Sequence, residues 1–380
     1  MLTTEILSGG EEIVRGLADE WASLCEEGAS NEPFLRPEWF AAFVKNFGCK
    51  IDIITVRRDG KLRALLPLMR SRSMLHGVPV RKLEAVYNLN TQRFDLIHGA
   101  DEAEKHAILR LLWKAVQGQP GWDVMEMRLV KKESWLADLL VVAEDESNKT
   151  GVWEMDAAPF IALPSGTDSE MTINEFLNGS RKHLRQQLDR RTRRLDEIGS
   201  VEHVVTREYS PDLLERYFEL ETKGWKGRQG TAVTDDAAVS RLHQDFAAAV
   251  SDKGALHAYE LRLDGKTIAM SLNILCGGRM VHWKTSYDEE YARYSPGNLL
   301  FKKLVADCME AKICEIDLLS PATANKRFWA TGERQHAAFY IFNRGLAGTL
   351  LHKWKFTVVS SLRGFKSGSR DALIPAHAAK

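Results

Sequence analysis

Two stretches of the chain, about two hundred residues apart, carry the same patterns in the same order. Each has an extended apolar segment with Asp-Gly-Lys at its centre, at residues 59–61 and 264–266, followed by a helical segment and a short apolar strand. Asp-Gly between alternating apolar residues is typical of a two-residue β-hairpin. The sequence therefore predicts an internal duplication of a mixed α/β unit.

The repeat extends upstream of both hairpins. Residues 11–29 and 37–47 have the apolar spacing of helices, and residues 213–225 and 237–250 repeat this pattern in the second half. Between the halves, residues 151–163 alternate like a strand and end at Pro164-Ser165-Gly166, a plausible domain junction. We therefore expect two tandem α/β domains, residues 1–165 and 166–365, and a flexible tail over 366–380.

Composition excludes several classes of protein. Of the 380 residues, 44% are apolar, and 52 Lys and Arg balance 52 Asp and Glu, so the net charge names no partner. The five cysteines form no CxxC motif, which favours buried thiols over disulfides or a zinc site, and we expect no metal. The chain shows neither a signal-peptide pattern nor a long apolar run. A cytoplasmic location is therefore expected.

The start of one helix in the second repeat suits an anion. Ser295 is placed to cap this helix, Pro296 fits its first turn, and Gly297 has no side chain to block the approach of a ligand. Free backbone N–H groups at such a helix start attract phosphate, and Arg293 adds positive charge. The alternative is a well-capped helix that binds nothing. The position of this turn between two strands of the repeated unit favours a ligand site.

These patterns resemble the GNAT acyltransferase fold, and the two units in tandem resemble its CelD-like branch, which is related in architecture to the Fem peptidyltransferases. The resemblance rests on four segments, namely residues 181–199, the segment around Trp225, residues 291–300 and residues 315–329. It implies two GNAT-like domains, the first degenerate, with acyl-CoA as co-substrate of the second. The implied coenzyme-binding residues are Arg293, Ser295, Gly297, Asn298 and Lys326.

The sequence departs from the family at two points. The glycine-rich loop pattern of GNAT proteins is met only loosely around Arg293 and Gly297, and the family's Tyr-Lys pair after the late strand is Asn325-Lys326 here. The first copy has acidic residues and no glycine at the corresponding helix start, near residue 101, which would repel a phosphate. If one copy binds the coenzyme, we expect it to be the second.

Acyl transfer requires a base for the acceptor's proton and an acid for the leaving thiolate. Strict alternation on the strand 279–288 would place His282, Lys284 and Ser286 on one face. We expect His282 to be the base because an ordinary histidine titrates near neutral pH, although a core histidine is the alternative. Asp317 is expected to orient His282 or the acceptor, and Tyr287 or Tyr291 to act as the acid.

Residues of an enlarged polar loop in the first copy are candidates for acceptor binding. Arg93 and Asp95 lie in this loop and could face a cleft shared by the two halves, although a polar loop is more often simply solvated. Trp225, in one of the segments that carry the resemblance, is a third candidate.

Residues 181–194 form a strongly basic helical segment, with seven Arg or Lys and one Asp beside an apolar stripe. Four interpretations remain open: a solvated face, an anionic membrane or lipid head group, a phosphate-bearing substrate or coenzyme, and RNA. Duplex DNA is disfavoured because no second DNA-binding element accompanies the patch. The amphipathic segment 346–366 suggests an additional peripheral contact with the inner membrane.

The resemblance implies an acyl-CoA-dependent N- or O-acyltransferase that acts on a cell-envelope precursor. The expected acceptors are an amino group of a polysaccharide or glycan precursor, or the amine of a sphingoid long-chain base. One alternative is a Fem-type transferase that uses aminoacyl-tRNA. A second alternative is a non-catalytic partner in a polysaccharide-synthesis complex.

Overall fold

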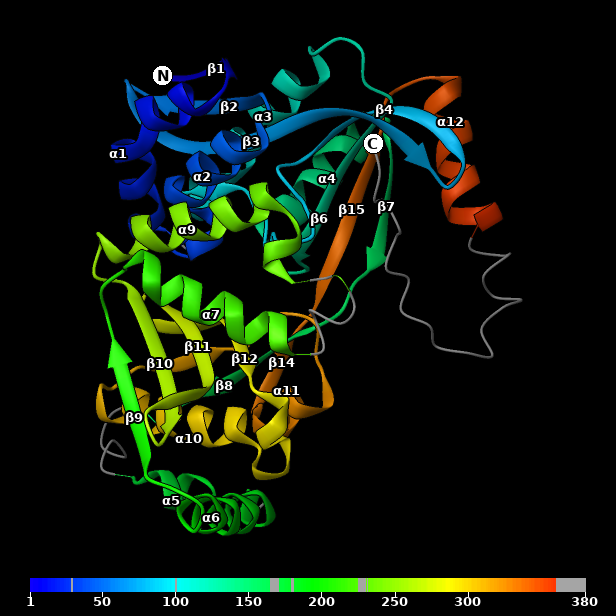
Figure 1. Cartoon of the computed structure of the whole chain (residues 1–380). Helices are drawn as coiled ribbons and strands as arrows, with labels where there is room; N and C mark the ends of the chain where they lie inside the picture. The colour runs from blue at the N-terminus through cyan, green and yellow to red at the C-terminus, as the bar shows by residue number, and fades with distance from the viewer. Residues whose placement is uncertain are drawn as a thin grey trace.

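The computed structural model describes residues 1–359 apart from residues 29, 100, 165–170, 179–180, 225–229 and 231. Two mixed β-sheets lie one above the other, with helices packed between them and on their outer faces (Figure 1). The first sheet consists of β1 (Leu2–Gly9), β2 (Ile51–Arg58), β3 (Lys61–Leu75), β4 (Val78–Ala85), β5 (Ile97–His98), β6 (Val124–Lys131), β15 (His336–Phe342) and β7 (Lys149–Glu154). The second consists, in spatial order, of β14 (Gly332–Arg334), β8 (Ala158–Ala162), β13 (Glu315–Asp317), β12 (Arg279–Tyr287), β11 (Lys266–Cys276), β10 (Leu256–Leu263) and β9 (Val201–Thr206).

Both Asp-Gly hairpins form as predicted. In β2–β3, Arg58 pairs with Lys61, and in β10–β11, Leu263 pairs with Lys266, so each turn has two residues. The backbone φ angles are +48° and +84° at Asp59-Gly60, and +50° and +79° at Asp264-Gly265. Two successive positive φ angles are those of a type I′ turn, whose twist matches that of the flanking strands. The mixed α/β class and the repeated unit are therefore confirmed.

The two halves exchange strands. Residues 151–163, predicted as one strand, contribute to two, because the chain leaves the first sheet after β7 and enters the second as β8. Conversely, β15 returns from the second half and inserts between β6 and β7 of the first sheet. A boundary at residue 165 therefore does not separate the two sheets. The ladder bonds of β8 and β15 hold each half to the other.

The predicted helix pairs are present in both halves. They are α1 (Glu11–Glu27) with α2 (Pro37–Phe47), and α7 (Pro211–Lys223) with α9 (Ala237–Ser251). Between the sheets, α2 packs on α9, and the rings of Trp39 and Phe246 meet edge to face with centroids 5.0 Å apart. One apolar core runs from the first sheet through these helices to β10 and β11. Full burial of a side chain such as Phe246 contributes roughly 1.5–3 kcal/mol.

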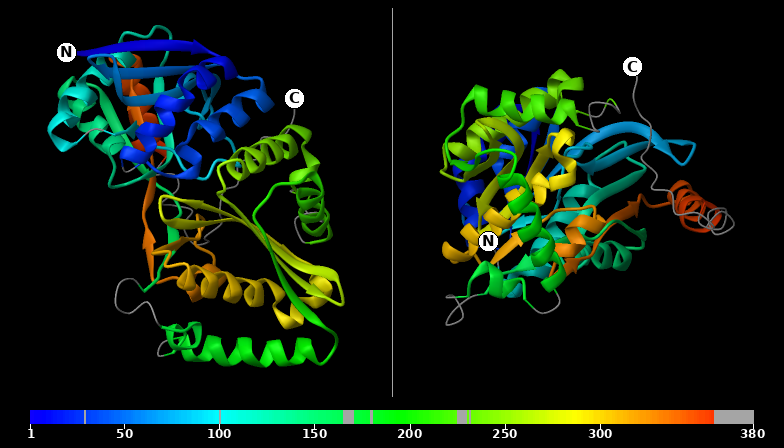
Figure 2. Two further views of the ribbon diagram at one scale, coloured as in Figure 1. Left: turned by 90° about the vertical axis from the view of Figure 1, so that its left-hand side faces the viewer. Right: turned by 60° about the horizontal axis from the view of Figure 1, so that its bottom comes forward.

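The remaining helices lie on outer faces. On the first sheet are α3 (Glu102–Gln117), α4 (Trp135–Asp145) and α12 (Leu346–Lys353), while α5 (Ile173–Phe176), α6 (Lys182–Asp196), α10 (Pro296–Glu310) and α11 (Ala324–Trp329) belong to the second. α6 lies along α10, on the side away from the first sheet, whereas α12 lies at the opposite end of the molecule (Figures 1 and 2). Within the described residues, the basic helix α6 and the amphipathic segment that begins with α12 therefore do not form one surface. Within the described residues, every helix is too short or too polar to cross a bilayer.

Candidate functional site

The second sheet opens between two of its strands. β12 and β13 run parallel and pair only over Arg279–Val281 and Glu315–Asp317. β12 then continues for six residues to Tyr287, while β13 ends at Asp317. Two adjoining pockets lie at this opening, and we call them together the central groove. Their shared lining residues are His282, Thr285, Tyr287, Leu318, Thr323 and Lys326.

The two pockets of the groove differ in what lines them. The α10 side, with a volume of about 360 Å³, is lined by Ser295, Gly297 and Asn298 at the helix start and by Phe301. The α7 side, of about 440 Å³, is lined by polar groups that include Glu221, Lys284 and Glu289. The groove thus connects the start of α10 with a charged pocket beneath α7, and the shared residues lie where the two pockets meet.

A β-bulge in β12 decides which side chains face the α10 side. The pairing with β11 shifts so that Asn273 opposes His282 and Leu272 opposes Lys284, which leaves Trp283 as the extra residue. Trp283 packs into the core beside Phe246, with ring centroids 5.2 Å apart. Beyond the bulge the two faces are exchanged, so Thr285 and Tyr287 join His282 on the α10 side. The predicted grouping of His282 with Lys284 and Ser286 on that face is therefore wrong, because strict alternation fails at a bulge.

His282 packs against an aromatic side chain of α10. Its ring meets that of Phe301 edge to face, with centroids 4.9 Å apart. Burial lowers the pKa of His282 to about 3, and the positive charge of Lys326 acts in the same direction. The expected titration near neutral pH required ordinary surroundings, which this ring does not have. His282 is therefore a neutral hydrogen-bonding group at physiological pH.

The start of α10 is open, but Ser295 does not cap it. Ser295 adopts the left-handed backbone conformation (φ 52°, ψ 54°), and its hydroxyl makes no capping hydrogen bond. Pro296 has no N–H, and the N–H of Asn298 is bonded to the carbonyl of Ser295 at 2.9 Å. The N–H of Gly297 has no acceptor within the described part of the chain. The Ser295 hydroxyl and the Gly297 N–H are thus available to a ligand, as an anion requires.

α11 closes the groove with contacts to its other walls. The ammonium group of Lys326 donates to the carbonyl of Leu319 at 3.0 Å, and Lys326 lines both pockets. Trp329 donates through its indole N–H to the Oδ1 atom of Asn298 at 3.0 Å. Asn298, which was expected to bind the coenzyme, therefore also holds α11 against α10 through its side-chain oxygen.

Asp317 is engaged with Arg93 rather than with His282. Its Oδ2 atom lies 2.6 Å from Nη1 of Arg93, and the same nitrogen lies 2.8 Å from Oε2 of Glu32. Burial would raise the pKa of Asp317, but Arg93 outweighs it and holds that pKa below the usual range. Lys131 and Arg279 complete this group around Glu32. We call these five residues the buried ion cluster; it joins both halves of the chain.

Two other expected residues, Arg293 and Tyr291, lie away from the groove. Arg293 is exposed, with its guanidinium group 4.7 Å from the ring centroid of Tyr294. The ring of Tyr291 lies under the ammonium group of Lys266, at 5.0 Å, and lines neither pocket. Tyr287 is therefore the tyrosine that the structure brings to His282. Trp225 lies outside the described residues.

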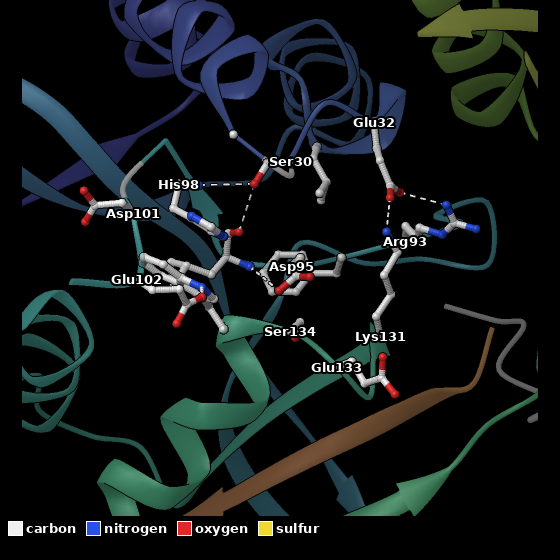
Figure 3. Close-up of a pocket in the computed structure, with 15 residues that line it drawn as sticks. Ser30, Glu32, Arg93, Asp95, His98, Asp101, Glu102, Lys131, Glu133 and Ser134 are labelled. Atoms are coloured by element: carbon white, nitrogen blue, oxygen red, sulfur yellow. Dashed lines mark hydrogen bonds and ion pairs between the residues drawn. The ribbon is translucent and has the colours of Figure 1, made fainter. Parts of the chain in front are cut away.

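The first half has its own pocket at the equivalent place, between the end of β6 and the start of α3 (Figure 3). This N-terminal pocket has a volume of about 430 Å³, and Asp95, Asp101 and Glu102 are among its acidic lining residues. Asp101 caps α3 itself by accepting the N–H of Glu104 at 3.2 Å. Burial raises the pKa of Asp95 to about 7. The start of α3 is thus occupied by a carboxylate, whereas the equivalent start of α10 in the second half is open.

The outward face of α6 is positively charged. Lys182, Arg190, Arg193 and Arg194 are exposed, while Leu184, Leu188 and Leu195 are buried. Asp189 is bound to Lys302 of α10 at 2.9 Å. Among the described residues, none of the four exposed cations has an ion-pair partner. These exposed cations thus give the outward face of α6 a positive charge.

Sequence reasoning missed several residues of the groove. Glu221 lies on α7, where its carboxylate accepts from the hydroxyl of Tyr217 at 3.2 Å and from the N–H of Val233 at 2.8 Å. An acid in the apolar stripe formed by Leu213 and Tyr217 was a signal for it. No pattern indicated Thr285, because the bulge that turns it into the groove is not visible in the sequence. Among the described residues, no three His, Cys, Asp or Glu side chains form a metal site.

A comparison with known families finds a match to most of the second half of the chain. Residues 182–327 match the family model of the acetyltransferase (GNAT) domain, and they contain both the open helix start and His282. The match covers the second repeat without the exchanged strands β8 and β15. Residues 182–327 therefore have the sequence pattern of an acetyltransferase (GNAT) domain.

Solved structures show the same tandem fold. FemX superposes with a TM-score of 0.59 and 12% sequence identity over 93% of this chain and 99% of that one. The C-terminal domain (DUF2156) of a candidate lysylphosphatidylglycerol synthetase from Agrobacterium fabrum gives a TM-score of 0.54 and 14% identity over 91% and 97%. At this identity the likeness concerns the fold alone.

One curated protein matches a segment of the sequence. A uronate isomerase from Xanthomonas campestris pv. campestris (strain B100) is 31% identical over 122 residues. The match covers 27% of this chain and 26% of that protein, about a quarter of each, so it assigns no family to the whole.

Proposed function

We propose that this protein transfers an acyl group from acyl-CoA to an amine or hydroxyl of a cell-envelope precursor. The observation that carries the proposal is the position of His282 where the α10 and α7 sides of the central groove meet. A donor held on one side and an acceptor held on the other would meet at this ring. Acyl transfer between two bound substrates requires such a geometry.

The α10 side suits the coenzyme. A diphosphate needs N–H and hydroxyl donors at a helix start, and the Gly297 N–H and the Ser295 hydroxyl supply them. A Cβ atom added at Gly297 would meet only the ring of Tyr287, at an ordinary contact distance of 3.6 Å, so the approach to the helix start is open. Lys326 supplies positive charge at the same wall.

The α7 side suits the head group of an acceptor. Glu221 and Glu289 provide carboxylates that favour a protonated amine, and Gln92, Ser286 and Thr323 provide groups that bond hydroxyls. An amine beside hydroxyls occurs in amino sugars and in the head of a sphingoid base. The groups that the pocket would bind, an amine and neighbouring hydroxyls, are therefore common to both acceptors.

The reaction forms one bond and breaks one. The acceptor attacks the thioester carbonyl carbon through a neutral amine nitrogen or a hydroxyl oxygen, so an acceptor that binds as an ammonium ion first releases one proton to solvent. A C–N or C–O bond forms, and the C–S bond breaks to release the thiolate. The acceptor's proton passes to the neutral His282 ring and then to the thiolate, which leaves as the thiol. Because the pKa of His282 is only about 3, the ring carries the proton transiently and does not store it. The Tyr287 hydroxyl is the second proton donor within reach of the groove.

The first experiment is calorimetry with coenzyme A, acetyl-CoA and palmitoyl-CoA on the full chain. We expect binding of all three, with the shared diphosphate providing most of the affinity. No heat of binding at millimolar ligand would overturn the proposal and would favour a non-catalytic partner of a polysaccharide-synthesis complex. A turnover assay with an amino sugar in one arm and a sphingoid base in the other then separates the two acceptors.

We also propose that the outward face of α6 rests on an anionic membrane surface. Each cation near such a surface contributes roughly 1 kcal/mol. Replacing Lys182, Arg190, Arg193 and Arg194 together by Gln should remove binding to vesicles that contain phosphatidylglycerol. The matched control replaces the exposed Arg72, Arg110, Arg241 and Lys253, which lie off α6. Unchanged vesicle binding by the α6 variant would refute this surface, and α6-dependent co-purification of tRNA would instead support the Fem-type donor.

A further inference from the structure

We infer that Asn273 is a positioning residue that fixes His282 in one tautomer, with the lone pair of Nε2 available in the central groove. The inference rests on the proposed function for its catalytic meaning. Its structural content is a chain of hydrogen bonds across three neighbouring strands, which can be tested whether or not the protein transfers an acyl group.

The β-bulge brings the two residues together. Asn273 of β11 is the direct neighbour of His282 across the ladder, and Asn273 is completely buried. The Oδ1 atom of Asn273 lies 2.7 Å from Nδ1 of His282. Without the bulge after His282, strict alternation would turn Thr285 and Tyr287 away from the face of His282. The bulge therefore allows Asn273 to pair with His282 while Thr285 and Tyr287 lie on the α10 side of the groove.

Two further contacts fix the orientation of the Asn273 amide. Its Nδ2 atom donates to the backbone carbonyl of His257 on β10 at 3.0 Å, and to the hydroxyl of Ser271 at 3.1 Å. A carbonyl oxygen can only accept, so the amide nitrogen must face His257 and the amide oxygen must face His282. The opposite orientation would place two oxygens against each other in a buried site, at a cost of about 1–3 kcal/mol for the unsatisfied groups.

The tautomer follows from this orientation. Because Oδ1 of Asn273 is an acceptor, Nδ1 of His282 must carry the proton and donate it. A neutral imidazole has one N–H, so Nε2 is left with a lone pair. An amide, unlike a carboxylate, orients the ring without adding negative charge, which agrees with a histidine that stays neutral. Asn273 therefore presents His282 as a proton acceptor.

The charged and titratable groups around the groove come from several elements. Lys326 on α11, Glu221 on α7, and Lys284, Tyr287 and Glu289 on or after β12 line the pockets that contain His282. Among the described residues, no carboxylate forms an ion pair with the His282 ring, whereas a carboxylate at position 273 would lie directly beside Nδ1. Asn273→Asp should therefore keep the Nδ1–H tautomer and raise the pKa of His282.

The first measurement is the ¹⁵N spectrum of the His282 ring in the wild-type protein. We expect the Nδ1–H tautomer, with Nε2 unprotonated, across the neutral pH range. An Nε2–H tautomer in the wild type would overturn the inference without any variant. Because this readout does not depend on acyl-CoA or on turnover, it stands apart from a failure of the proposed function.

Variants add a kinetic readout. Asn273→Ala should release the ring to a mixture of tautomers and lower kcat by about ten-fold to a hundred-fold, less than the roughly 10²–10⁴-fold effect of a general base because the ring itself remains, while the KM for acyl-CoA stays unchanged. Asn273→Asp should recover most of kcat and move the acid limb of kcat/KM to higher pH. Asn148→Ala is the matched control, because Asn148 is also buried and donates to a backbone carbonyl, that of Phe342 at 2.9 Å, in the first sheet.

Retention of the Nδ1–H tautomer and of full turnover in Asn273→Ala would refute the positioning role. Equal loss of kcat in Asn273→Ala and Asn148→Ala would also refute it, because both changes would then act only through stability. If Asn273→Ala does not fold, Asn273→Asp and the wild-type spectrum decide the question.

Discussion

At the level of single residues, the protonation state of a side chain depends more on its burial than on its residue type. From the sequence, His282 was chosen as a base and Asp95 as an acceptor-binding candidate, and both lie partly buried in the walls of pockets. Burial disfavours the charged form of each, so the pKa of the histidine falls to about 3 and that of the aspartate rises to about 7. A side chain's role therefore follows from its surroundings.

His282→Ala should lower kcat on the order of 10²–10³-fold, since a positioned proton acceptor contributes about that much. The dissociation constant for coenzyme A should not change, because the diphosphate is held at the start of α10. Steady-state kinetics and calorimetry measure the two quantities. Undiminished turnover would remove His282 from the mechanism, and His106→Ala, at an exposed position on α3, is the control.

Asp95→Asn should stabilise the protein increasingly as the pH rises from 5 to 8. In the folded chain, Asp95 keeps its proton up to about pH 7, whereas in the unfolded chain it loses it near pH 4. Between these values the folded state binds the extra proton, so the wild type loses stability with rising pH and the amide variant does not. Thermal melts at each pH measure the difference. A stability difference that is independent of pH would show that Asp95 titrates normally.

At the level of elements, one helix start differs between the two copies of the repeat. α3 begins with Asp101, which caps the helix, and α10 begins with Ser295, which does not. The same fold thus has a closed helix start in the first half and an open one in the second. The sequence showed this difference directly, because the first copy has acidic residues where the second copy has a glycine.

Gly297→Leu should weaken binding of coenzyme A at least ten-fold with little change in thermal stability. A Cβ atom at this position meets only the Tyr287 ring, at an ordinary contact distance of 3.6 Å, so the backbone can accept a side chain. The rest of the leucine side chain must then occupy the α10 side of the groove. Calorimetry measures the affinity, with Gly297→Ala as the smaller control. An unchanged dissociation constant would show that the diphosphate binds elsewhere.

At the level of the whole molecule, the halves are held together by exchanged strands, by a shared apolar core and by the buried ion cluster. β8 and β15 each pair within the sheet of the other half. Arg93 of the first half binds Asp317 at the end of β13, directly before the residues that line the groove. The groove therefore depends on contacts from both halves.

Arg93→Met should destabilise the protein by about 3–5 kcal/mol, the usual result of removing one partner from a buried ion pair. Glu32 and Asp317, each at most 3% exposed, would remain as buried charges without their guanidinium partner. Urea unfolding measures the loss. The control is Arg110→Met, an exposed position on α3. A loss below about 1 kcal/mol would show that Lys131 and Arg279 compensate the two carboxylates by themselves.

The sequence alone determined the features that depend on neighbouring residues. The Asp-Gly hairpins, the helix pairs, the duplicated unit and the open turn at Ser295–Gly297 all follow from local patterns, because turn chemistry and apolar periodicity act over a few residues. The structure brings His282, Tyr287, Gly297 and Lys326, which the sequence named as catalytic or coenzyme-binding candidates, to one groove, and their roles stay predictions.

Only the tertiary structure decided the features that depend on distant residues. The exchange of β8 and β15, the bulge at Trp283 and the pairing of Arg93 with Asp317 each require segments far apart in the chain to meet. The bulge turned Thr285 into the groove, and the cross-strand register brought Asn273 to His282. Strand register and burial are set by packing of the whole chain, and for that reason no local pattern could indicate them.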